Sequence, residues 1–115
     1  MAPDFNRELA RLSGFIESKR FELENILRAE AGTTGFAGGD WGHGGRSYVK
    51  LEDEASTGWM IRVVDSGGRE HVFDQPRSVE LLFGGDAELR NLARALVFIV
   101  ETLFRQEPGL YNLLK

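Results

Sequence analysis

The amino-acid sequence predicts an α+β fold, a two-layer sandwich in which an N-terminal and a C-terminal helix cover one face of an antiparallel four-strand meander. Three observations favour this class. Apolar residues recur every three or four positions near both ends of the chain, the middle alternates apolar and polar residues, and short connections separate the alternating segments. Because such links join neighbouring antiparallel strands, we expect the order α-ββββ-α.

Length and composition indicate a single domain over residues 1–115. Of the 115 residues, 42% are hydrophobic and 10% are aromatic. This is enough apolar material for one packed core and too little for two independent ones.

The first helix is expected over residues 4–31. Asp4 is the expected N-cap, and Gly32 is expected to end the helix in a left-handed conformation. Gly14 is interpreted as an interruption that the helix tolerates at about 1 kcal/mol, with close approach of another helix as the alternative. The apolar face consists of Phe5, Leu9, Leu12, Ile16, Leu23, Ile26 and Leu27.

A glycine-rich loop is expected over residues 32–46. Repeated glycine makes both helix and strand unstable there. Phe36 and Trp41 favour a loop that is held against the body or that contacts a ligand. Whether the loop is ordered or binds a ligand stays open.

Four strands are expected within residues 47–83, at 47–52, 57–64, 70–74 and 78–83. Strand alternation divides their side chains between two faces. The expected core face carries Val49, Leu51, Trp59, Ile61, Val63, His71, Phe73, Val79, Leu81 and Phe83. The opposite face mixes apolar and charged residues, as interaction surfaces do, so we expect a partner to bind this face and the loop. The expected partner-binding residues are Trp41, Tyr48, Lys50, Met60, Arg62, Val64 and Glu80.

The second helix is expected over residues 86–107, with Asp86 as its N-cap and a wide apolar stripe facing the core. Pro108 and Gly109 end it. The segment 108–115 is an apolar tail, which we expect to dock on the body or on a neighbouring chain.

The residues that carry chemistry do not form a familiar motif. Phosphate-binding loops lie between a strand and a helix, whereas this glycine loop leaves a helix and enters a strand. With no cysteine, the metal-ligand candidates reduce to His43 and His71 with a few carboxylates. We therefore expect no enzyme activity, no cofactor and no metal. If an active site exists, its expected place is where the loop meets the sheet, around Asp40, His43, Arg46 and Arg62.

Charge and hydropathy narrow the compartment and the partners. A net charge of −4 opposes general binding to nucleic-acid backbones and favours a basic protein partner. The acidic turn Glu52, Asp53 and Glu54 is interpreted as a solvated turn, with contact to a basic surface as the alternative. The start of the chain lacks a basic segment followed by an apolar one, and no apolar run reaches about 20 residues, so we expect a cytoplasmic protein without a membrane span.

These observations predict a small acidic protein-binding module, acting by protein–protein contact as an inhibitor, immunity, anti-defence or adaptor protein. The first alternative is a homo-oligomeric structural or chaperone-like subunit, with a homodimer as the expected oligomer. The second is a small-ligand binder or enzyme in which the glycine-rich loop acts as a lid.

Overall fold

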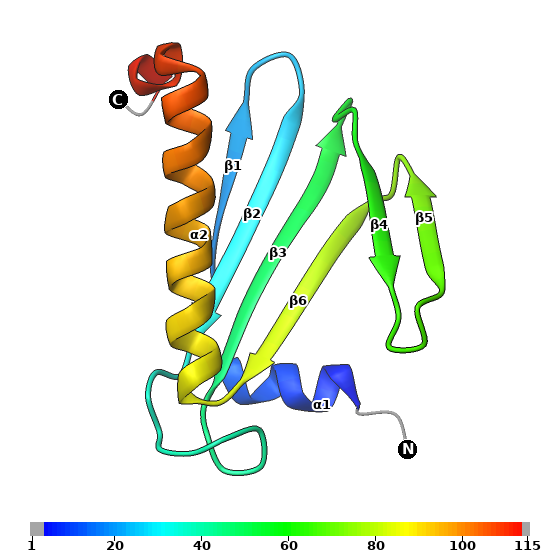
Figure 1. Cartoon of the computed structure of the whole chain (residues 1–115). Helices are drawn as coiled ribbons and strands as arrows, with labels where there is room; N and C mark the ends of the chain where they lie inside the picture. Colours follow the sequence, from blue (N-terminus) through cyan, green and yellow to red (C-terminus); the bar gives the residue numbers. More distant parts are fainter. Residues whose placement is uncertain (1–3, 114–115) are drawn as a thin grey trace.

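A computed structural model describes residues 4–113 and confirms the α+β class. A four-stranded antiparallel sheet is joined to a helix at each end of the chain (Figure 1). In chain order the elements are α1 (Phe5–Leu9), η1 (Ala10–Leu12), β1 (Glu17–Glu22), β2 (Ile26–Thr33), β3 (Arg46–Ala55), β4 (Met60–Val64), β5 (Glu70–Asp74), β6 (Ser78–Gly84), α2 (Asp86–Gln106) and η2 (Pro108–Leu113).

The helix predicted over residues 4–31 is wrong beyond its first turns. Asp4 does cap α1, because its carboxylate accepts a hydrogen bond from the amide of Arg7. Gly14, however, adopts a left-handed φ of 87° and turns the chain out of the helix. The rest of the segment forms the hairpin β1–β2, so Gly32 lies in a strand and ends no helix. Apolar residues at intervals of three and four do not make this segment helical, because its backbone pairs as strands instead.

The predicted meander is also wrong in its connections. The four-stranded sheet has the order β1-β2-β3-β6, and β4 pairs only with β5 in a separate two-stranded sheet. We call this hairpin, residues 57–74, the arm. Non-glycine residues with positive φ stand at both ends of it, Ser56 at 60° and Gln75 at 55°, and they turn the chain out of the main sheet. The Trp59 indole donates to the Pro76 carbonyl at 2.8 Å and ties down the base of the arm.

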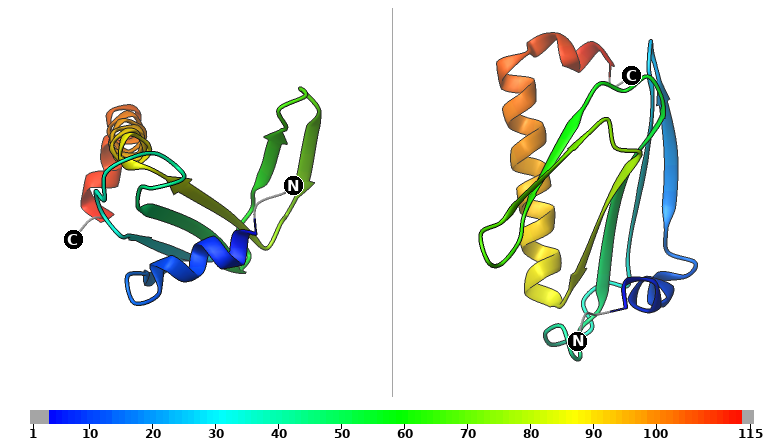
Figure 2. Two further views of the ribbon diagram at one scale, coloured as in Figure 1. Left: turned by 90° about the horizontal axis from the view of Figure 1, so that it is seen from below. Right: turned by 90° about the vertical axis from the view of Figure 1, so that its right-hand side faces the viewer.

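The two helices lie on opposite sides of the main sheet instead of covering the same face. Figure 2 shows α1 on one side, whereas α2 and the arm both rise from the other side. The tail packs on its own helix, since the rings of Phe104 in α2 and Tyr111 in η2 lie 4.7 Å apart. Residues 114–115 of the predicted tail lie outside the described residues.

The glycine-rich loop, which spans residues 34–45 between β2 and β3, holds the base of α2. Gly85 is the N-cap and has a φ of 116°, so the prediction of Asp86 as N-cap is wrong by one residue. The Asp86 carboxylate instead accepts hydrogen bonds from the amides of Ala37 and Gly38. This contact fixes where α2 leaves the sheet.

The core is small and lies where α1 and η1 pack on β3. Leu12 and Tyr48 are the buried hydrophobic residues of the described chain, at 0% and 4% exposure. Beside them Arg46, 2% exposed, donates from Nε to Glu8 at 2.7 Å and from its terminal nitrogens to the carbonyls of Trp41, Gly44 and Gly45. Its guanidinium stacks 4.2 Å from the centre of the Trp41 ring. Arg46 therefore joins α1, the loop and β3.

We predict that Arg46→Ala lowers the free energy of unfolding by about 3 kcal/mol, because it removes the closer ion pair of Glu8 and the guanidinium donor of the Trp41 and Gly44 carbonyls, whereas Glu8 keeps Arg11 and the Gly45 carbonyl keeps the Gly85 amide. Chemical denaturation followed by circular dichroism measures this change. The control is Arg77→Ala, which removes an exposed arginine from its pair with Glu52 and should change stability by less than about 0.5 kcal/mol. Equal losses in the two variants would contradict the linking role of Arg46.

Candidate functional site

The predicted partner-binding residues do not share one face. Tyr48, Lys50 and Glu80 lie on the main sheet, on the side of α1, because strand alternation puts Tyr48 and Lys50 on the face of Arg46, which binds Glu8 of α1, and Glu80 is the cross-strand partner of Lys50. Three other residues lie on β4 in the arm: Met60, Arg62 and Val64. Trp41 lies in the loop. The prediction of a single surface assumed that β4 paired with β3, which it does not.

The sheet residues of that set are engaged within the chain. The Tyr48 hydroxyl donates to Glu80 at 2.6 Å. Burial and this hydrogen bond raise the pKa of Tyr48. Lys50 lies between Glu30 and Glu52, at 3.4 and 3.5 Å. Burial alone would lower the pKa of Lys50, but the two carboxylates outweigh it and raise that pKa.

The acidic turn is also paired internally. Glu54 contacts Arg20 and Arg28 at 3.0 and 3.1 Å. Asp53 accepts from the Thr57 amide, which closes the turn into the arm. Burial would raise the pKa of Glu52, but Lys50 and Arg77 outweigh it and lower that pKa. Because Glu52 and Glu54 each pair with two basic side chains, the carboxylate that the turn leaves for a basic partner is mainly that of Asp53.

The four residues suggested for an active site do not converge. Asp40 and His43 face each other at 3.5 Å, and both side chains are exposed. Arg46 is buried against Glu8, and Arg62 lies on the arm. Trp41 stacks beneath Arg46, and its ring lies so close to Gly84 that a side chain there would collide with it. Over residues 4–113, no group of three His, Asp or Glu side chains is placed to hold a metal ion.

An exposed apolar surface lies on the other side of the main sheet. Its floor is the face that carries Ala31, Val49 and Leu81, which lie directly opposite one another on β2, β3 and β6. Helix α2 forms one wall and the arm forms the other (Figure 2). We call this floor and its two walls the cradle. The predicted core residues Val49, Leu51, Val79 and Leu81 do belong to the floor, whereas Ile61, Val63, His71 and Phe73 belong to the arm.

A groove of about 440 Å³ runs along the helical wall of the cradle. Leu89, Leu92 and Leu96 of α2 face Ala31 and Val49 of the sheet across it. No loop residue from 34 to 45 lines this groove. Sequence reasoning missed Ala29 and Ala31 as floor residues because it placed them in a helix. The small side chain of Ala31 lines the groove between the sheet and α2.

Farther along α2 the apolar side chains are about half exposed. The exposed fractions are 41% for Leu96, 49% for Ile99 and 53% for Leu103. In the arm Met60, Val64 and Val72 on one face of the hairpin and Val63 and Phe73 on the other are likewise exposed. A two-stranded hairpin is at best marginally stable in water unless it packs against something. Both walls of the cradle therefore lack a covering layer within residues 4–113.

The raised pKa of Tyr48 predicts a loss of stability at alkaline pH. A tyrosine whose pKa is higher in the folded than in the unfolded chain stabilises the fold below the unfolded value of about 10 and loses that contribution as the pH rises past it. Unfolding free energies between pH 8 and 11 should fall more steeply in the wild type than in Tyr48→Phe. At pH 8 the variant should be less stable by about 1 kcal/mol. Tyr111→Phe is the control and should keep the wild-type slope, and equal slopes for all three proteins would contradict the prediction.

None of the helices within residues 4–113 has the length and apolar character needed to cross a membrane. Comparisons of the chain with protein-family models, with curated proteins and with solved structures find no match.

Proposed function

We propose that this chain is a protein-binding module that works by self-association, with a second copy of the chain covering the cradle. The observation that carries the proposal is the amount of surface left exposed. The accessible surface is 8755 Å². A compact monomer of 12.9 kDa exposes about 6,300 Å².

The excess, about 2,400 Å² per chain, matches what permanent dimers bury. Such interfaces cover about 1,000–2,500 Å² on each partner and resemble a domain core cut in half. The radius of gyration agrees, since it is 15.8 Å, whereas a compact domain of 115 residues has about 13.4 Å. Two buried hydrophobic residues over the described part of the chain are few for a domain of this size.

The chemistry of the surfaces supports the cradle over the face that the sequence favoured. Charged side chains on the α1 side of the sheet already have partners in the chain, among them the pairs of Glu54 with Arg20 and Arg28. The cradle offers apolar side chains from the floor and both walls. Burial of that area is the largest available source of association free energy, at about 25 cal/mol per Å² before the costs of association. An inhibitor, immunity or adaptor role through a different protein stays the alternative proposal.

The first prediction from this proposal concerns the wild-type protein. Light scattering with sedimentation from 1 to 100 µM should give about 26 kDa, twice the 12.9 kDa of one chain. Because the interface is apolar, the dissociation constant should change less than about threefold between 50 and 500 mM salt. A mass of one chain at 100 µM would contradict self-association. It would favour the alternative proposal, in which a different protein is the partner.

The second prediction concerns the floor. Leu81→Glu places a charge on exposed apolar surface in β6 and should weaken dimerisation at least about tenfold, or about 1.4 kcal/mol. The matched control is Leu23→Glu, the same substitution at an exposed leucine in the turn between β1 and β2, outside the cradle. Sedimentation equilibrium measures both. Equal effects of the two substitutions would show that the floor is not the interface.

A further inference from the structure

Helix α2 carries apolar residues in a heptad pattern, and the sheet of its own chain covers these side chains only in part. Apolar residues alternate at intervals of three and four along one side of it: Leu89, Leu92, Leu96, Ile99 and Leu103. Intervals of three and four place these side chains on one side of the helix, where they can pack on a sheet or along another helix. We call these five residues the seam. A helix that packed only on a sheet would not need a seam exposed along its second half.

The exposure of the seam rises along the helix. Leu89 and Leu92 are partly covered, near the end that Asp86 and the loop hold. Leu96, Ile99 and Leu103 are 41% to 53% exposed. Of the strands, β6 is the one that α2 contacts most, and it leads directly into the helix. Residues 4–113 therefore cover the second half of the seam only in part.

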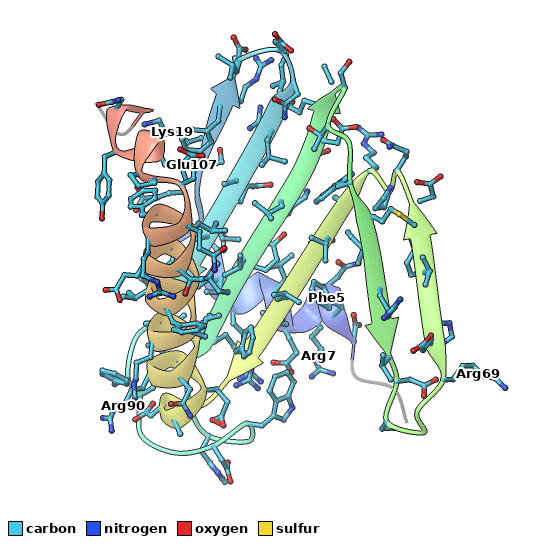
Figure 3. The ribbon with its side chains drawn as sticks, turned by 45° about the horizontal axis from the view of Figure 1, so that its top comes forward. Phe5, Arg7, Lys19, Arg69, Arg90 and Glu107 are labelled. Atoms are coloured by element: carbon cyan, nitrogen blue, oxygen red, sulfur yellow. The ribbon has the colours of Figure 1, made fainter. Side chains whose placement is uncertain are left out.

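The exposed part of the seam faces the inside of the cradle. In Figure 3 Arg90 points away from the arm, and its guanidinium lies 5.7 Å from the Phe36 ring in the loop. Ile99 follows Arg90 by nine residues, about two and a half turns at about 3.6 residues per turn. Ile99 therefore projects from the opposite side of α2, toward the space between α2 and the arm.

We infer that α2 of a second copy packs along this seam inside the cradle, so that the two α2 helices form the centre of the dimer. This inference rests on the proposed self-association and adds which element of the partner occupies the cradle. The seam is apolar at all five positions, so two copies of it are complementary to each other without any buried charge. The pairing also gives the exposed half of the seam the cover that its own sheet does not supply.

The absence of cysteine from the chain allows a direct test by crosslinking. Ile99→Cys places a thiol on the seam, and Arg90→Cys places one on the opposite side of the same helix. Under mild oxidation at 50 µM, seam cysteines at positions 92, 96, 99 and 103, tested singly and in mixed pairs so that parallel and antiparallel helices are both covered, should include a combination that forms covalent dimers at least about tenfold faster than Arg90→Cys, because disulfides need Cα atoms within about 7 Å. Testing several positions also covers the case in which one variant fails to fold, with folding checked by circular dichroism.

The mass of the wild type, measured in parallel, separates the two proposals. A wild-type monomer at 50 µM would overturn both self-association and helix pairing. A wild-type dimer in which Arg90→Cys crosslinks as fast as the folded seam variants would overturn the helix pairing alone. A dimer in which the seam variants crosslink preferentially would support both.

Discussion

The buried guanidinium of Arg46 is the interaction on which the arrangement of the other elements depends. It binds Glu8 of α1 and the carbonyls of the loop, and it holds the Trp41 ring over Gly84. The loop held in this way presents its amides to Asp86, which fixes the start of α2. One buried side chain thereby links the N-terminal helix to the direction in which the C-terminal helix leaves the sheet.

The two sides of the sheet have different physical roles. On the α1 side, strand pairing brings opposite charges together, as between Lys50 and Glu30, and the small core lies there. On the α2 side the strands offer apolar residues to a helix that covers them only in part. Exposed ion pairs contribute little stability, whereas uncovered apolar area favours association. By this contrast the cradle, and not the α1 side, is the surface whose burial would favour association.

Several parts of the fold were predictable from the sequence, and others were not. The strong apolar stripe of α2 and the cap at Asp4 are local features, and both were predicted correctly. Residues 17–33 have a spacing compatible with a helix, yet they form β1 and β2 because β2 pairs with β3 along most of its length. Pairing between segments this far apart in the chain leaves no local sign in the sequence.

The sequence by itself determined the class of the fold, the second helix and the alternation of Val49, Leu51, Val79 and Leu81 on one face, because each follows from periodicity within a few residues. Only the tertiary structure decided that β6, and not β4, lies next to β3, and that the arm and α2 rise on the same side. The positive φ angles at Ser56 and Gln75 and the contacts of Arg46 decide this, and they depend on the folded chain as a whole. The apolar seam was visible in the sequence as part of a core stripe, but its exposure is a property of the folded chain.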